Sequence, residues 1–182
     1  TLTLIQHGVP CDISISPTNR THGYSATTNL VSLAAPAGCA WTIVNANNWI
    51  TIISGTNGTG SNSVTYAVAA NSTALERTGV VMIADQLLTL IQHAAPCTFA
   101  ISTTSRTHGY SGATNLVILT TPLGCPWNVV NTNDWVTITS PANGSGNATI
   151  SYTVETNPDT FNRTGVVMIA DQSLTLRQLA AP

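Results

Sequence analysis

Short segments in which apolar and polar residues alternate run along the whole chain. Clear examples are "DISIS" at 12–16, "WTIVNA" at 41–46 and "SVTYAVAA" at 63–70. Alternation with a period of two places every second side chain on the same face, and it therefore predicts strands with one buried face. No segment sustains the 3.6-residue period of an amphipathic helix. The pattern predicts an all-β protein.

The remaining segments of the first half follow the same scheme. Strands are expected at 28–35, 49–54, 80–84 and 87–92, with a polar loop at 19–25 and a glycine-rich turn at 55–62. A tight turn at Asp85-Gln86 is expected to join the last two strands into a hairpin.

The sequence repeats itself with an offset of 86 residues and without a gap. "RTHGYS" at 20–25 returns at 106–111, and "RTGVVMIADQ" at 77–86 returns at 163–172. About seven short strands in each repeat, separated by regular turn signals, indicate an immunoglobulin-like β-sandwich. We therefore expect an all-β fold with two tandem immunoglobulin-like β-sandwich domains, at 11–96 and 97–182, and one extra terminal strand at 1–10.

One strand-like phrase occurs three times, as "TLTLIQH" (1–7), "LLTLIQH" (87–93) and "SLTLRQL" (173–179). The position that reads Ile5 and Ile91 becomes Arg177, so it faces water and the leucines face the core. With three copies for two repeats, one strand is supernumerary and needs another sheet. We expect it to mediate assembly, either in a covalent array or by strand addition between chains. The residues expected to act in this assembly are Leu2, Leu4, Gln6, Leu174, Leu176 and Gln178.

The four cysteines recur with the repeat. Cys11 and Cys39 are separated by the same interval as Cys97 and Cys125, which predicts one disulfide per repeat. Closing such a loop stabilises by about 3–4 kcal/mol in the chain-entropy model. A zinc site is the alternative, but the sequence has no Cys-x-x-Cys pair. Disulfides predict an extracellular or cell-surface location.

Composition excludes several classes of protein. Only 7% of residues are charged, no lysine occurs and the net charge is −2, so the chain has no basic surface for nucleic acid. No apolar run approaches 18 residues, and no membrane insertion is expected. The chain begins at Thr1 without a leader sequence, so we expect a processed chain or a piece of a longer one.

Catalytic chemistry has little support in the sequence. The only glutamates, Glu76 and Glu155, are at non-equivalent repeat positions, and the histidine of the recurring strand (His7, His93) becomes Leu179. The acidic residues do not have calcium-loop spacing. We expect no catalytic residues, no metal and no cofactor.

Two features could bind a ligand. "RTHGYS" combines Arg, His and Tyr, although a structured loop in which Tyr24 and Tyr110 cap the sandwich is the favoured interpretation. Trp49 and Trp135 are candidates for stacking on a sugar, against packing in the core. Trp41 and Trp127 are expected in the core beside the disulfides.

Six Asn-x-Ser/Thr sequences are candidate glycosylation sites in a secreted protein. They are Asn19, Asn57, Asn71, Asn143, Asn147 and Asn162.

Residues 125–178 combine several motifs in a fixed order. They are Cys125-x-Trp127, Trp135 before "TITS", "YTVETN" (152–157), and "RTG" (163–165) with the closing "TLRQ" (175–178). In this combination the segment resembles the BACON domain. Residues 39–92 match in the same way. The resemblance implies an immunoglobulin-like β-sandwich of bacterial or phage extracellular proteins, for which carbohydrate binding has been proposed.

Function is therefore expected in one of two classes. The first is a structural repeat of a fibre, filament or surface array whose partners are further copies of itself. The second is a carbohydrate-binding or adhesin module whose partners are glycans.

Overall fold

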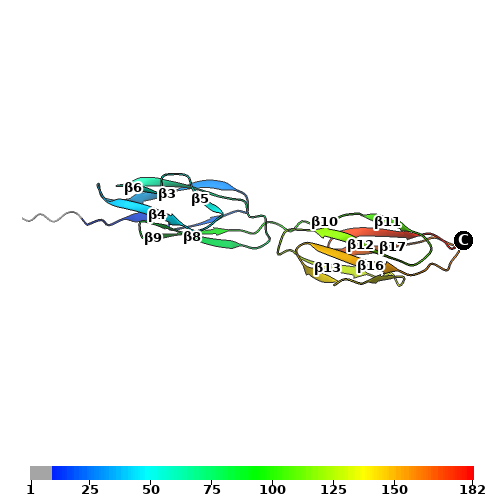
Figure 1. The fold of residues 1–182 in the computed structure, drawn as a ribbon. Coiled ribbons are helices and arrows are strands. Elements are labelled where there is room, and N and C mark those ends of the chain that lie inside the picture. The colour runs from blue at the N-terminus through cyan, green and yellow to red at the C-terminus, as the bar shows by residue number, and fades with distance from the viewer. Residues whose placement is uncertain (1–9) are drawn as a thin grey trace, which may run out of the picture. The chain divides into compact units, whose positions relative to one another are not determined.

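The computed structural model describes residues 10–182, and all of its regular structure is β (Figure 1). The chain divides into two compact units, Thr1–Ala95 and Pro96–Pro182. Each unit contains one four-stranded and one five-stranded sheet. The fold is therefore two tandem β-sandwich domains of the immunoglobulin-like type, as predicted.

In the first domain the four-stranded sheet has the order β1-β3-β7-β5 and the five-stranded sheet has the order β2-β9-β8-β4-β6. The strands are β1 (Ser14–Ser16), β2 (Asn19–His22), β3 (Thr27–Ala34), β4 (Ala40–Asn45), β5 (Ile50–Ile52), β6 (Asn57–Thr59), β7 (Asn62–Val68), β8 (Arg77–Ile83) and β9 (Gln86–Gln92). Every pairing is antiparallel except that of β2 with β9, which is parallel.

The second domain repeats this topology, with sheets β10-β12-β16-β14 and β11-β18-β17-β13-β15. Its strands are β10 (Ala100–Ile101), β11 (Ser105–His108), β12 (Ala113–Thr120), β13 (Pro126–Asn131), β14 (Val136–Ile138), β15 (Asn143–Ser145), β16 (Ala148–Val154), β17 (Arg163–Ile169) and β18 (Gln172–Gln178).

Each core lies between the two sheets of its domain. Inward positions alternate along the strands, so that Val64, Tyr66 and Val68 of β7 face Val81 and Ile83 of β8 in one buried cluster. An equivalent cluster forms around Tyr152 in the second domain. The alternation in the sequence therefore reports the buried faces directly.

The prediction of a polar loop at 19–25 is wrong in part. Residues 19–22 form strand β2, which pairs with β9 in parallel from Asn19↔Thr89 to His22↔Gln92. The segment has no apolar alternation because its inward side chain is a histidine, and tertiary pairing makes it a strand. With β2 and the short β6, each domain has nine strands rather than seven.

The hairpin turn lies one residue earlier than predicted. β8 ends at Ile83 and β9 begins at Gln86, so the turn residues are Ala84 and Asp85, with φ of 50° and 63°. Positive φ at both central residues is the requirement of a type I′ turn, whose twist matches the two strands it joins. Gln86 is thereby the first residue of β9.

The recurring strand closes its own domain. β9 lies between β8 and β2, and β18 lies between β17 and β11. Leu88, Leu90, Leu174 and Leu176 are buried, whereas Arg177 is exposed, which confirms the predicted orientation of these two copies. Leu2, Leu4 and Gln6 lie outside the described residues.

Candidate functional site

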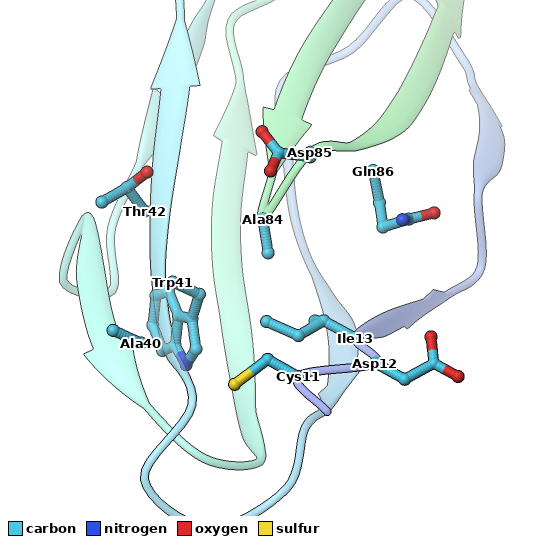
Figure 2. A pocket seen from close by; sticks show the side chains of 9 residues that line it. All are labelled: Cys11, Asp12, Ile13, Ala40, Trp41, Thr42, Ala84, Asp85 and Gln86. Atoms are coloured by element: carbon cyan, nitrogen blue, oxygen red, sulfur yellow. The ribbon is translucent and has the colours of Figure 1, made fainter. Parts of the chain in front are cut away.

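One end of the first sandwich contains a cavity of about 400 Å³. We call this end of each domain the disulfide end. The cavity is lined by Cys11, Asp12, Ile13, Ala40, Trp41, Thr42, Ala84, Asp85 and Gln86 (Figure 2). Figure 2 shows the carboxyl groups of Asp12 and Asp85 directed away from each other, so they do not form a paired acid–base site. The second repeat has Thr98, Phe99 and Pro126 in place of Asp12, Ile13 and Ala40.

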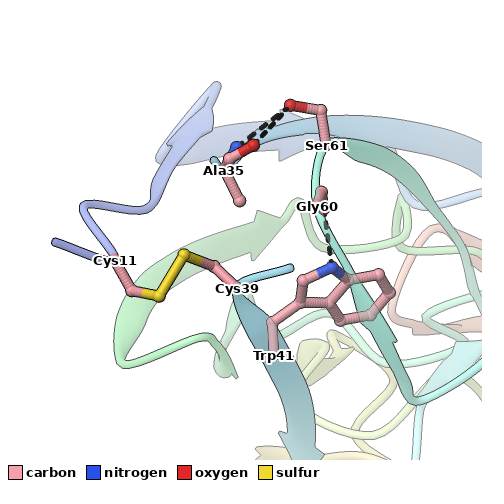
Figure 3. The surroundings of a disulfide bond; sticks show 6 residues. All are labelled: Cys11, Ala35, Cys39, Trp41, Gly60 and Ser61. Carbon is pink, nitrogen blue, oxygen red and sulfur yellow. Dashed lines mark hydrogen bonds between the residues drawn. A yellow bond between two sulfur atoms is a disulfide. The ribbon is translucent and has the colours of Figure 1, made fainter. Parts of the chain in front are cut away.

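The disulfides form as predicted. Cys11 is bonded to Cys39 and Cys97 to Cys125, with Cα atoms 5.5 Å apart in each pair. Figure 3 shows the first bond beside Trp41, whose indole N–H donates to the Gly60 carbonyl at 2.9 Å. No cysteine of the described chain is left free, so a zinc site is not formed.

Trp41 belongs to the core, as predicted. It is 4% exposed, and Gly58 passes so close that a Cβ atom there would lie 2.5 Å from the indole ring. Its repeat counterpart Trp127 is half-buried and donates to the Gly146 carbonyl at 2.8 Å. In both domains the glycine-rich hairpin packs against the indole.

The "RTHGYS" motif is internal structure rather than a ligand pocket. His22 is buried, and its Nε2 lies 3.2 Å from the hydroxyl oxygen of Tyr66, with the two rings edge to face. Arg20 donates from its guanidinium to Asn29 Oδ1 at 2.8 Å. His108, Tyr152 and Arg106 repeat the arrangement in the second domain. Tyr24 and Tyr110, by contrast, are exposed.

Burial perturbs the titration of this pair of rings. It lowers the pKa of His22 below its usual 6.5, and the Arg20 cation lowers it further. Burial raises the pKa of Tyr66, against a smaller opposing effect of Arg20. His22 is therefore held neutral in the folded domain, where its imidazole serves as a hydrogen-bonding core residue.

At the opposite end of each domain, a buried glutamine organises a polar cluster. We call this end the glutamine end. Gln92 is 0% exposed, accepts from Arg77 Nε at 2.9 Å, and donates to the Ala69 carbonyl at 3.0 Å. Two longer bonds, of 3.3 and 3.4 Å, reach the carbonyls of Tyr24 and Ser25. Gln178 and Arg163 form the same cluster in the second domain.

Sequence reasoning placed Gln178 on the assembly strand but missed this internal role of both glutamines. The signal was present: Leu88, Leu90 and Gln92 are spaced two apart, so the glutamine shares the buried face of the two leucines. The register of the strand therefore identifies Gln92 as a buried residue that needs partners.

The arginine of this cluster lies over the tryptophan ring that was a candidate for sugar stacking, in both domains. The guanidinium carbon of Arg77 lies 4.5 Å from the ring centroid of Trp49, and that of Arg163 lies 4.6 Å from Trp135. The other contacts of Trp49 are with the core and with Gly79, where a Cβ atom would lie 2.8 Å from the ring. This geometry favours packing and a cation–π contact over an open sugar platform.

One candidate glycosylation site is excluded by its position. Asn71 is 1% exposed, and its side-chain amide donates to the carbonyls of Leu75 and His93 at 2.7 and 3.0 Å. An amide nitrogen bound in this way cannot accept a glycan without local unfolding. The other five candidates are exposed: Asn19, Asn57, Asn143, Asn147 and Asn162.

Residues 10–182 contain no group of three His, Cys, Asp or Glu side chains positioned to hold a metal ion. Within the same range, no helix has the length and apolar character needed to cross a bilayer.

Comparison with known proteins identifies both repeats. Residues 126–179 match the family model "BACON: Putative binding domain, N-terminal", and residues 12–86 match "Viral BACON domain". No curated protein matches the chain.

Among solved structures, a Bacteroides ovatus GH5 xyloglucanase in complex with a XXXG heptasaccharide is 23% identical, with a TM-score of 0.42. The match covers 46% of this chain but only 19% of the xyloglucanase. The D00-D0 domain of intimin is 14% identical over 93% of this chain and 98% of its own, with a TM-score of 0.33. The sialic acid binding region of a Streptococcus sanguinis SK1 adhesin is 10% identical over 95% of this chain and 78% of its own, also with a TM-score of 0.33.

The second match spans β1 to β8 of the first domain, and the first match spans β13 to β18 of the second domain. The chain belongs to the BACON domain family, and each of its two repeats is matched by a BACON model.

Proposed function

We propose that this chain is a structural repeat module of an extracellular fibre, filament or surface array, which assembles head to tail through β-strand pairing. One observation carries the proposal. Both described domains complete their own sandwich with a β8–β9 or β17–β18 hairpin, yet the sequence holds a third copy of the closing strand at 1–7.

The three copies agree where a closing strand is buried. Leu2, Leu4 and Gln6 correspond to Leu88, Leu90 and Gln92, all of which face the core in the first domain. The face formed by Leu2, Leu4 and Gln6 would be unfavourable in an unpaired linker, because the leucines would expose apolar surface and the glutamine would have no buried partners. The sequence of 1–7 therefore suits the closing position of another sandwich.

The use of side chains in the described domains also supports a structural role. The buried histidines, the tryptophans and four of the arginines bind other groups of their own domain. We accordingly propose that the chain is not an enzyme. The disulfides support an oxidising, extracellular location.

Carbohydrate binding is the second candidate, supported by the cavity at the disulfide end of the first domain. Its lining offers the carboxylates of Asp12 and Asp85, the amide of Gln86 and the hydroxyl of Thr42, which are the kinds of group that hydrogen-bond sugar hydroxyls. The matched family is described as a putative binding domain. Titration with oligosaccharides, using Asp85→Ala as the matched variant, tests this candidate.

The structural proposal is tested by comparing residues 1–182 with residues 8–182 in sedimentation velocity over a range of concentrations. The longer protein is expected to form concentration-dependent oligomers that the shorter one lacks. Leu2→Asp combined with Leu4→Asp should abolish them, whereas Ile5→Arg, which introduces the residue found at the equivalent Arg177, should not. If all four proteins remain equally monomeric, and native material shows no filament or longer tandem chain, the proposal is wrong.

A further inference from the structure

In each domain the chain enters and leaves at opposite ends. Cys11 lines the cavity at the disulfide end together with Ala40 and the Ala84–Asp85 turn. Gln92, the last residue of β9, is bound at the glutamine end to Arg77 and to the carbonyl of Ala69. A pull on the chain is therefore applied across the whole length of the domain.

The disulfide changes which strands carry such a pull. Cys39 immediately precedes β4 and lies 28 positions after Cys11, and the segment between the two cysteines contains β1, β2 and β3. Tension that reaches Cys11 passes through the sulfur–sulfur bond to Cys39 and into β4. The intervening segment carries no tension while the bond is intact.

We infer that each domain is a tension-bearing module in which the disulfide diverts load from β1–β3 into the β4-β8-β9 part of the five-stranded sheet. The inference rests on the proposed structural role. It concerns the single domain, and it does not require association between chains.

The loaded strands are arranged to resist being pulled past one another. β4 and β9 both run antiparallel to β8, so they are parallel to each other, and a pull on the start of β4 and the end of β9 acts along the strands. Backbone hydrogen bonds lie across the strands, so this direction loads many of them together. Along this path β4 has three residue pairs with β8, and β9 has seven with β8 and four with β2.

The protected segment begins with a short edge strand. β1 has only three residue pairs with β3 and is the first strand after Cys11. Without the disulfide, a pull at Cys11 would reach this short strand first. β4 also has three residue pairs with β8, but it has three more with β6 on its other side. The bond therefore moves the load from an edge strand to a strand that is paired on both sides.

The exit point is reinforced by Gln92. Its side chain connects the end of β9 to the start of β8 through Arg77, and to the loops after β2 and β7 through the carbonyls of Tyr24 and Ala69. Gln178 makes the corresponding bonds at the end of β18, and Cys97–Cys125 spans the same 28 positions. Both domains thus share the same path for tension.

Single-molecule force spectroscopy on residues 1–182, held by handles at both ends, tests the inference. In a Cys11→Ala/Cys39→Ala variant, the second domain keeps its disulfide and serves as the internal reference. The extension released when the first domain unfolds should be longer by about 100 Å of contour, since the bond no longer spans a sequence separation of 28 positions at ~3.6 Å each. It should also begin at a lower force than in the parent protein, with a first step in which β1 detaches. If the variant domain unfolds at the parent force in one step, the disulfide does not divert load from a weak element.

A second pair of variants separates mechanical effects from simple loss of stability. Ile15 on β1 and Leu90 on β9 are both buried, so alanine at either site destabilises the first domain in urea. With the disulfide intact, β1 is not loaded, so the contacts of Ile15 are still present in the transition state and Ile15→Ala should leave the unfolding force unchanged. The contacts of Leu90 lie on the loaded β9 and are lost there, so Leu90→Ala should lower the force. In the Cys11→Ala/Cys39→Ala background the pull reaches β1, so Ile15→Ala should then lower the force at which the first domain begins to unfold. An equal drop for both variants with the bond intact would overturn the inference.

These outcomes are independent of the assembly experiment. Residues 8–182 retain both disulfides and every strand described here, so the force measurement can be repeated on a protein that lacks the third strand copy. A monomeric protein with the expected force pattern would contradict assembly alone, and a filament without the pattern would contradict tension bearing alone.

Discussion

Replacing Gln92 with methionine isolates the contribution of the polar cluster at the glutamine end. Methionine is similar in length and unbranched, so it fills the buried site but cannot replace the amide. The change removes the acceptor of the Arg77 Nε–H and one of the donors to the carbonyls of Ala69, Tyr24 and Ser25. Gln92 is fully buried and Arg77 is half-buried, so the guanidinium left without its acceptor is partly desolvated.

The size of the effect follows from which groups lose their last partner. The Ala69 carbonyl still accepts from Arg77 at 2.7 Å, and the Tyr24 carbonyl still accepts from the Asn71 backbone N–H at 2.8 Å. The main losses are the charged Arg77 bond, at about 1.5–3 kcal/mol, and the weaker bond to Ser25, at about 0.5–1 kcal/mol. We expect a total of about 2–4 kcal/mol, a large share of the roughly 5–15 kcal/mol that stabilises a typical domain.

Urea denaturation of residues 1–182 measures this loss, with the unchanged second domain as reference. At a slope of about 1.5 kcal/mol/M, the midpoint of the first domain should fall by about 1–3 M. Gln86→Met is the matched control, because Gln86 is the exposed first residue of the same strand and should cost less than about 0.5 kcal/mol. Equal midpoints for the two variants would show that the cluster contributes nothing and would refute the reasoning.

Three further changes test other parts of the structure. Burial lowers the pKa of His22 and His108 below 6.5, whereas the unfolded chain keeps the ordinary value. The contribution of the two histidines to stability should therefore be constant above about pH 7.5 and fall as the pH drops through 6.5. Urea midpoints between about pH 4 and 8 check it, and His22→Gln with His108→Gln should flatten the curve. Gly79→Ala should lower the free energy of unfolding by about 1–3 kcal/mol, because the new Cβ would lie 2.7 Å from Asn47 Oδ1. The Asn47 side chain cannot easily move away, since its Nδ2 donates to the Val80 carbonyl at 2.7 Å. Gly23→Ala is the control: a Cβ there meets open space, so the same denaturation assay should show almost no change. Ile91→Arg should change the thermal midpoint little, since Arg177 is exposed at the equivalent place in β18, and a loss comparable to that of Leu90→Arg would contradict the assigned face of the strand.

Alternation predicted the fold class and most strands because the inward positions of the long strands are apolar. It failed for β2 and β6, whose sequences "NRTH" and "NGT" contain no alternation. β2 is a strand because His22 reaches Tyr66 across the core and because β9 offers a free edge for parallel pairing, and neither fact is local in sequence. The hairpin turn was displaced because Ala84, a residue that rarely adopts positive φ, occupies its first central position.

The candidate sites were also unpredictable where their surroundings come from residues distant in sequence. A tryptophan at the start of a strand and an Asn-Ser-Thr sequence are each compatible with exposure, and only the packed structure shows that Arg77 covers Trp49 and that Asn71 is buried. The disulfides, in contrast, were predictable, since a duplicated cysteine interval constrains both partners at once.

Four of the five arginines bind amide side chains of their own domain. The four are Arg20, Arg77, Arg106 and Arg163, which donate to asparagine or glutamine. Within residues 10–182 no arginine forms a salt bridge, and the one histidine–carboxylate contact is His93 Nδ1 to Glu76 Oε2 at 3.0 Å. An amide acceptor satisfies the guanidinium without the desolvation of a second charge that a buried carboxylate would require. The outer faces of the sheets can therefore consist of threonine, serine and apolar residues, such as Val44, Met82 and Leu87, with few charges nearby. A surface of this kind does not repel a copy of itself, so the internal use of charge and the proposed role in a packed array are physically consistent.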